Sequence, residues 1–252
     1  MAFVFAGRWE WPIGLALLAT VAVAATAGAV VQLVALRPLG RFDPTTNVGW
    51  IVTTFAVGLV AIDLVSITVD SNPHTIPPLV QSVFGWEVWR PAGVPITAVD
   101  AVIVVTTLAL VVALDAFQRR TMLGRAFRAV AQDPQTASLM GVNPQAVVVA
   151  SFALAGALAA IGAVLLAPKL GVQLGNGATV AVQAFIAAVI GGLGSTRGAI
   201  VGGYAIGITS AAVKTISASA TRYEPLAVFV LFLLVLVVRP AGVFGARATE
   251  RV

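Results

Sequence analysis

The sequence predicts an all-α, polytopic transmembrane helical bundle with about seven membrane passes. Of its 252 residues, 59% are hydrophobic and only 10% are charged, whereas about a quarter of the residues of a soluble domain are charged. The apolar residues gather in long stretches, and about 20 of them are needed for a helix to cross a bilayer. Basic residues are concentrated in alternate connecting segments, a distribution that sets the orientation of membrane proteins.

Seven apolar stretches are predicted to be membrane passes. The four long ones are residues 13–36, 51–69, 96–117 and 146–167. The three shorter ones are residues 180–193, 199–213 and 226–238. Glycines interrupt the fifth and sixth stretches, so these are predicted to be either two tilted helices or a re-entrant pair.

The distribution of basic residues tests this count independently. If the N-terminus lies outside, ten of the fifteen basic residues fall on inner segments: Arg37, Arg41, Arg119, Arg120, Arg125, Arg128, Arg197, Arg239, Arg247 and Arg251. The outer five are Arg8, Arg90, Lys169, Lys214 and Arg222. This bias supports an odd number of passes and a cytoplasmic C-terminus. Because the basic residues are scattered between apolar runs, the net charge of +5 predicts no nucleic-acid partner.

The inner segment 119–145 carries the clearest polar pattern. Asp133 and Pro134 form a helix start, with Asp as the N-cap and Pro at the first helical position. Gly141 is well placed as the C′ residue that ends this helix. The pattern predicts a helix over residues 134–140, roughly 10 Å long.

This short helix has two alternative interpretations. Ala137, Leu139 and Met140 are expected to form a small apolar face, and Arg125 and Arg128 form a basic amphipathic approach to it. The segment is either an ordinary loop whose arginines touch anionic lipid headgroups, or a rigid helix that passes movement to a soluble partner.

The stretch GRAFRAVAQDPQTASLMGVN, residues 124–143, resembles the cytoplasmic coupling loop of ABC-transporter permeases. It is similar in particular to the branched-chain amino acid (LivH-type) permeases, with G-R-A-x-R-A-x-A-x-D followed by A-x-L-x-G-I-N. The general permease signature E-A-A-x-x-x-G aligns with residues 135–141, departing at its Glu and first Ala. The resemblance continues in ALRPLGRF (35–42), AFIAAVIGGLGSTRGAIVGG (184–203) and LVLVVRPAGVFG (234–245).

This resemblance covers most of the chain and implies one permease domain over residues 1–252, with a coupling loop at 119–145 that docks on cytoplasmic ABC ATPase subunits. The implied coupling residues are Gly124, Arg125, Arg128, Ala131, Asp133, Pro134, Ala137, Leu139 and Gly141. It also implies a second permease subunit, identical or different, and an extracytoplasmic substrate-binding protein. The implied location is the bacterial cytoplasmic (inner) membrane. The outer segment 70–95 is either an interfacial loop anchored by tryptophans or a docking surface for that binding protein.

Family members usually begin with an additional membrane segment containing an N-F-A-H-G-like motif, which nothing in this sequence matches. The resemblance therefore predicts either a start codon assigned too late or a shortened variant. Branched-chain amino acids are the family's default substrates, but relatives carry other amino acids, urea or short amides. No residue in the chain selects among them.

The glycine-rich stretch 191–207 is not predicted to bind phosphate, because the sequence lacks the motif G-x-x-x-x-G-K-[ST]. We therefore expect no cofactor in this chain and no ATP hydrolysis by it; ATP and Mg²⁺ would be bound by the partner ATPase. The glycines either let helices pack closely in lipid or form a flexible break that lines the transport pathway. They are Gly191, Gly192, Gly194, Gly198, Gly202 and Gly203.

Asp63 lies well inside the second apolar stretch. Ionisable residues inside membrane helices are rare, so Asp63 is predicted to line the pathway or to form an interhelical hydrogen bond. An alternative function is an autonomous ion-coupled secondary transporter that uses Asp63. The sequence contains no cysteine and shows no catalytic set or metal-ligand cluster, so neither an enzyme nor a metal site is predicted.

Overall fold

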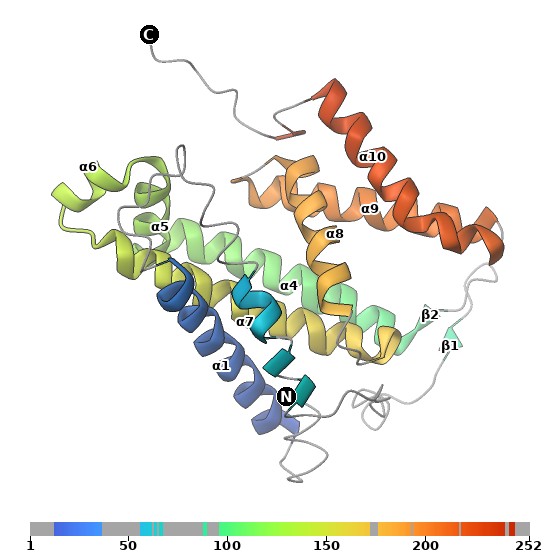
Figure 1. Cartoon of the computed structure of the whole chain (residues 1–252), viewed down its shortest axis with the longest axis horizontal. Helices are drawn as coiled ribbons and strands as arrows, with labels where there is room; N and C mark the ends of the chain where they lie inside the picture. Colours follow the sequence, from blue (N-terminus) through green and yellow to red (C-terminus); the bar gives the residue numbers. More distant parts are fainter. Residues whose placement is uncertain are drawn as a thin grey trace. The chain divides into compact units, whose positions relative to one another are not determined.

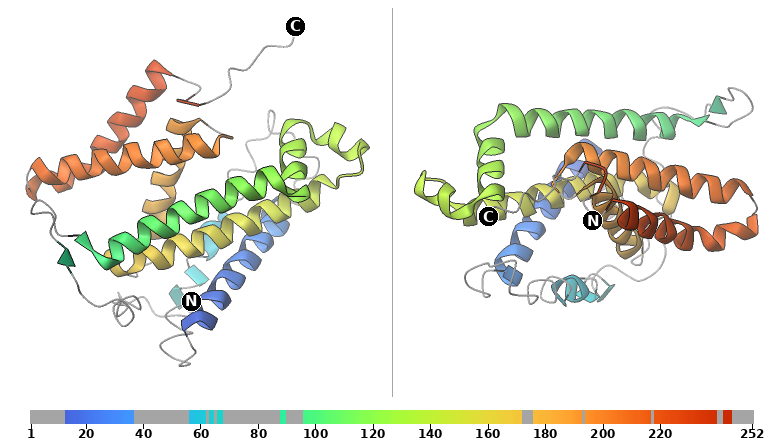
Figure 2. Two further views of the ribbon diagram at one scale, coloured as in Figure 1. Left: turned by 180° about the vertical axis from the view of Figure 1, so that it is seen from behind. Right: turned by 90° about the horizontal axis from the view of Figure 1, so that it is seen from above.

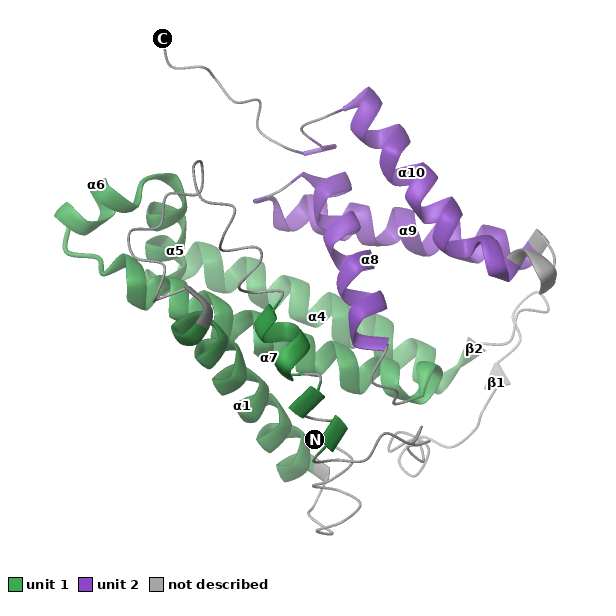
Figure 3. Ribbon diagram, viewed as in Figure 1, with its two compact units in different colours: residues 1–174 green, residues 175–252 purple. Residues whose placement is uncertain are grey.

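The computed structural model of this chain is mainly helical, and the predicted all-α, polytopic fold class is confirmed. The residues that it describes are 13–36, 56–61, 63–64, 66–67, 88–89, 96–171, 176–192, 194–216, 218–239 and 242–244. The chain divides into two compact units, residues 1–174 and 175–252 (Figure 3). The single domain over residues 1–252 stays a prediction.

Unit 1 contains three long helices, and the second and third of these are joined through two short ones. Its helical elements are α1 (Ile13–Val31), the π-helical turn η2 (Gln32–Leu36), α4 (Ala98–Arg120), α5 (Met122–Gln132), α6 (Pro134–Leu139) and α7 (Pro144–Leu170). Figure 1 shows α5 and α6 together at the end of unit 1 where α4 ends and α7 begins. A two-residue antiparallel pair, β1 (Val88–Trp89) with β2 (Ile96–Thr97), precedes α4.

Helices α1 and α7 cross at close range (Figures 1 and 2). A Cβ atom at Gly28 would overlap the backbone carbonyl of Phe152, and a Cβ atom at Gly156 would overlap the backbone carbonyl of Ala24. Moving forward along α1 from Ala24 to Gly28 means moving backward along α7 from Gly156 to Phe152, so the two helices are antiparallel. Small residues allow this direct backbone contact, which is a common way for helices to associate in membranes.

Helices α4 and α7 are also joined at the end of unit 1 away from α5 and α6. The Lys169 ammonium group pairs there with the Asp100 carboxylate. Asp100 also accepts a hydrogen bond from the Thr97 backbone N–H at 3.0 Å, which fixes the first turn of α4. Nearer the other end of α4, Arg119 Nε lies 3.0 Å from the Asp115 carboxylate, one helical turn before it.

Unit 2 consists of α8 (Asn176–Gly191), α9 (Thr196–Ile216), the 3₁₀ turn η5 (Ala218–Tyr223) and α10 (Glu224–Val238). Helices α8 and α9 meet at an angle of 119°. The core of this unit consists of the buried residues Ile186, Ile190, Ile206 and Val228. Lys214 Nζ lies 2.9 Å from the Glu224 carboxylate and joins the end of α9 to the start of α10.

Four described helices are long and apolar enough to cross a membrane. They cover Gly14–Val34, Ala98–Arg120, Pro144–Leu170 and Thr221–Val238. The bent pair α8 and α9 is either one broken span or a re-entrant loop. The re-entrant arrangement is one of the two that the glycine pattern predicts. Seven passes stay a prediction, because the stretch 51–69 is described only in part, as helical residues 56–61, 63–64 and 66–67, and the outer segment 70–95 only at 88–89.

Candidate coupling segment

The coupling segment, residues 121–144, begins where the chain turns at the end of α4 (Figure 2). The Thr121 hydroxyl donates a hydrogen bond to the Phe117 carbonyl at 2.6 Å and accepts one from the Gly124 N–H at 3.0 Å. Gly124 is buried, and a Cβ atom there would overlap the Phe117 carbonyl. The rings of Phe117 and Phe127 lie 6.0 Å apart. These contacts hold α5 at a fixed angle against α4.

Helix α6 begins as its sequence predicts. Asp133 Oδ1 accepts hydrogen bonds from the backbone N–H groups of Gln135, at 2.9 Å, and Thr136, at 3.1 Å. Asp133 Oδ2 accepts a further bond from the Thr136 hydroxyl. Pro134 occupies the first turn, where a missing N–H leaves no hydrogen bond unmade. The predicted N-cap is therefore confirmed.

The end of α6 is a Schellman motif. Gly141 has a φ of +82°, its N–H donates to the Ser138 carbonyl at 3.1 Å, and the Val142 N–H donates to the Ala137 carbonyl at 3.1 Å. The predicted helix end at Gly141 is confirmed. The helix itself covers Pro134–Leu139, one residue less than predicted, because Met140 is the C-cap.

Helix α7 begins at Pro144, three residues after Gly141. Asn143 Oδ1 accepts hydrogen bonds from the N–H groups of Gln145, at 3.0 Å, and Ala146, at 3.3 Å. Thus every turn between α6 and α7 is held by a cap.

The exposed apolar surface of α6 contains fewer residues than the sequence predicts. Leu139 is 86% exposed and Met140 is 81% exposed, whereas Ala137 is only 4% exposed. The prediction that Ala137 shares one apolar face with Leu139 and Met140 was wrong. Each residue of a helix is rotated by about 100° from the one before it, so Ala137 and Leu139 lie on opposite sides. Leu139 and Met140 alone form what we call the apolar tip.

Helix α5 adds positive charge beside this tip. Arg125, Arg128 and Ala131 are exposed, and α5 itself contains no acidic residue. The nearby carboxylate of Asp133 caps α6. The surface of the coupling segment is therefore apolar at its tip and at Met122 and Leu123, the exposed first residues of α5, and basic at the two arginines of α5.

In unit 2, three of the predicted glycines bring α8 and α9 into backbone contact. A Cβ atom at Gly191 would overlap the backbone of Gly198, and one at Gly202 would overlap the backbone of Ala187. Gly203, in contrast, faces open space. Gly192 and Gly194 have φ values of +100° and +87°, which form the bend. A role of these glycines in the transport pathway stays a prediction.

The C-terminal residues 242–244 close the end of α8, which the sequence reasoning missed. The Val243 N–H donates to the Ile190 carbonyl, and the Phe244 N–H donates to the Gly191 carbonyl, both at 2.9 Å. A helix end leaves such carbonyls without partners inside the helix. The only signal was the family-like stretch 234–245, which gave no indication of this pairing.

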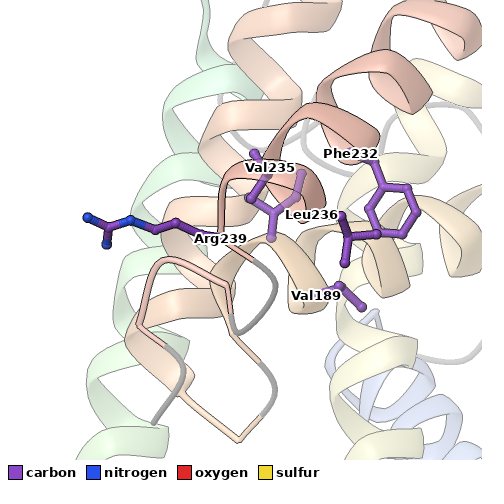
Figure 4. Close-up of a pocket in the computed structure, with 6 residues that line it drawn as sticks. Val189, Phe232, Val235, Leu236 and Arg239 are labelled. Carbon is purple, nitrogen blue, oxygen red and sulfur yellow. The ribbon is translucent and has the colours of Figure 1, made fainter. Parts of the chain in front are cut away.

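A shallow hollow in unit 2 is lined by Val189, Ile190, Phe232, Val235, Leu236 and Arg239. Figure 4 shows the Arg239 side chain extending away from its apolar neighbours. The hollow encloses no space large enough for a water molecule.

Asp63 is the predicted site residue in the second apolar stretch. Its side chain is exposed, and its backbone carbonyl accepts a hydrogen bond from the Ser66 hydroxyl at 2.7 Å. Within the described ranges, no group of three His, Cys, Asp or Glu side chains could hold a metal ion.

The fold and the coupling segment define a multi-pass helical membrane protein with a capped helix that projects between two spans. Residues 1–238 match the family described as "Branched-chain amino acid transport system / permease component". The chain belongs to this family. It is therefore a multi-pass membrane protein of the transport class.

Individual relatives agree with this assignment. The permease protein BraD of the high-affinity branched-chain amino acid transport system of Pseudomonas aeruginosa is 32% identical over 241 residues, covering 94% of this chain and 76% of the relative. LivH of the corresponding system of Escherichia coli is 32% identical, covering 92% and 74%. A probable LivH protein of Methanocaldococcus jannaschii is 26% identical, covering 86% and 71%. No solved structure gives a significant match.

Proposed function

We propose that this chain is the membrane-spanning permease subunit of an ATP-driven ABC importer in the cytoplasmic (inner) membrane. Its substrates are branched-chain or related amino acids, which the names of its relatives support. Helix α6 docks on a cytoplasmic ATPase subunit, which binds ATP and Mg²⁺; this chain holds no cofactor. A second permease subunit completes the pathway, and an extracytoplasmic binding protein delivers the substrate.

The apolar tip is the observation that carries this proposal. Leu139 and Met140 project from a six-residue helix that is capped at both ends. Removing apolar surface from water is favourable by about 25 cal/mol per Å², so an exposed tip of this kind gains from binding in an apolar groove. A rigid mount is needed as well, because only a rigid body passes on the movement of its partner.

The mechanism that follows is alternating access. Closure of the ATPase subunits on ATP moves α6, and the Schellman turn at Gly141 and the cap at Asn143 pass this movement to α7. Helix α7 packs along α1 through Gly28 and Gly156. The two helices therefore respond together, and the bundle changes the side on which the pathway opens.

The test is co-purification from native membranes in mild detergent, with partners identified by mass spectrometry. Leu139→Arg is expected to lose the ATPase while membrane insertion and the second permease are retained, because a charge would enter the apolar groove. Gln135→Arg adds the same charge to an exposed position of the same helix and is expected to keep the ATPase. Ala137→Arg is less informative, because Ala137 is buried and its replacement would disturb α6 itself. An ATPase retained by Leu139→Arg would contradict the docking proposal.

A second candidate is an autonomous ion-coupled secondary transporter, which the exposed carboxylate of Asp63 favours. A charge facing lipid is costly, so an exposed Asp63 requires water or another chain beside it. This alternative predicts that uptake collapses when the ion gradient is dissipated and is sensitive to Asp63→Asn. The importer predicts instead that uptake follows the ATP level when the gradient is removed.

A further inference from the structure

Gln32 is a buried polar residue that the coupling segment does not explain. It is the first residue of η2, the π-helical turn that ends α1, and it is only 7% exposed. Its amide oxygen Oε1 is buried and has no hydrogen-bond partner among the described residues. Gln32 lies within Gly14–Val34, an apolar stretch long enough to cross the membrane.

An unpaired amide oxygen in such a position is unfavourable. Inside a membrane there is no bulk water to replace a missing hydrogen bond. An apolar side chain of the same size would avoid the cost, so the amide requires an explanation. π-Helical turns within helices are frequently found at functional sites.

The antiparallel packing of α1 against α7 places Gln32 near the end of α7 that joins the coupling segment. Gly28 contacts Phe152 and Ala24 contacts Gly156, so moving towards the end of α1 means moving towards the start of α7. Gln32 is one helical turn beyond Gly28, and η2 packs against α7. Gln32 therefore lies level with the first turns of α7, which are fixed to α6 by the Asn143 cap.

Helix α7 carries one hydroxyl group within about one helical turn of the level of Gln32, on the exposed residue Ser151. Ser151 is the only Ser, Thr or Tyr residue of α7 and directly precedes Phe152. Its hydroxyl donates instead to the Val147 carbonyl of its own helix, at 2.9 Å. That carbonyl is also a normal acceptor within the helix, so the hydroxyl can turn away without leaving it unpaired.

We propose that Gln32 is a positioning residue for transport: its amide oxygen is unpaired in the state described here and accepts a hydrogen bond from Ser151 in the other state of the transport cycle. The inference rests on the proposed function, because movement of α6 and α7 provides the second state. A hydrogen bond made in only one state shifts the ratio of the two states by about 2- to 12-fold, which is its net contribution expressed as a ratio. Gln32 would thus make the second state accessible.

Gln32→Met, which is close in size and apolar, provides the main test. In the purified chain it should raise the thermal midpoint by about 2–4 °C, because the unpaired oxygen is removed from the described state. In membranes containing the partner subunits it should lower the maximal uptake rate by about 2- to 12-fold and leave KM unchanged. Gln32→Glu, which keeps an acceptor oxygen when protonated, should restore the uptake rate.

Two further variants separate positioning from packing. Ser151→Ala should lower the uptake rate to a similar extent without raising the thermal midpoint, and combining it with Gln32→Met should cause no additional loss. Thr20→Val is the matched control, because Thr20 is buried on the same helix but its hydroxyl already bonds the Ala16 carbonyl at 2.7 Å. This control should leave uptake unchanged.

A Gln32→Met variant with a lower thermal midpoint, or with normal uptake, would overturn the proposal. Additive losses in the Gln32 and Ser151 double variant would overturn the assigned partner. The thermal midpoint is measured without an ATPase, and co-purification of the ATPase is measured separately. A failure of the importer proposal is therefore distinguishable from a failure of this inference.

Discussion

The coupling segment and the bend between α8 and α9 both interrupt helices, but they satisfy their backbone groups differently. In the coupling segment, the side chains of Asp133 and Asn143 cap the following helices, and the turn at Gly141 bonds only carbonyls of α6. At the bend, the Ile190 and Gly191 carbonyls are bonded by the N–H groups of residues 243–244, from the far end of unit 2.

This difference separates local from long-range structure. The capped segment depends on residues within a few positions of each helix end, so it stays folded when its surroundings move. The bend has a local cap as well, because the Ser195 hydroxyl accepts a hydrogen bond from the Gly198 N–H at 3.1 Å, but the last carbonyls of α8 depend on a segment that is distant in sequence. We expect the bend to be sensitive to added volume and the coupling segment to be sensitive to lost hydrogen bonds.

The largest effect is expected from Gly198→Leu. A side chain at Gly198 would overlap the Gly191 backbone, which cannot move away without opening the crossing of α8 and α9. The free energy of unfolding should fall by about 3 kcal/mol, the upper part of the range for overpacking. Thermal unfolding in detergent measures this, with Gly203→Leu on the same helix as the control, because Gly203 faces open space. Equal loss in both variants would show that the crossing is not the sensitive feature.

A smaller effect is expected from Gly242→Val. Gly242 has a φ of +78°, and a side chain there would overlap the Gly192 backbone. Displacing this segment leaves the Ile190 and Gly191 carbonyls without donors, at a cost of about 2 kcal/mol. Hydrogen exchange at the Val243 and Phe244 amides should become faster. Val243→Ala, which keeps the backbone bonds, should leave the Phe244 amide protected; exchange as fast as in Gly242→Val would contradict the backbone explanation.

The smallest effect on stability is expected from Asp133→Ala, at about 1 kcal/mol, the typical contribution of an N-cap. Its effect on uptake should be larger than its effect on stability, because α6 would lose its rigid start. Asp133→Asn keeps an acceptor oxygen and should preserve most of the uptake. Uptake and thermal unfolding of both variants, measured side by side, check this. Unchanged uptake in Asp133→Ala would show that a rigid α6 is not needed.

The same contrast explains what could be predicted from the sequence. Asp133 and Gly141 each act on neighbouring residues, so their pattern alone predicted both ends of α6. Helical spacing places Ala137 and Leu139 on opposite sides of α6, but which of the two sides is buried depends on how α6 packs in unit 1. The pairing of residues 242–244 with α8 joins segments far apart in sequence, for which no local pattern exists.

Gln32 shows another limit of sequence reasoning. The composition of residues 13–36 predicted a membrane helix, and a single amide within it does not change that prediction. Its importance depends on two properties of the folded chain, the π-helical turn and the burial of its oxygen. Neither follows from hydropathy.

The length of α6 has a practical consequence for inhibitor design. Isolated helices shorter than about 12–15 residues are marginal in water, and α6 has six residues. A linear peptide copied from residues 133–143 would therefore be mostly unfolded and would be a weak competitor for the groove that we propose receives Leu139 and Met140. A cyclised peptide that holds these two side chains in their helical arrangement is the better starting point.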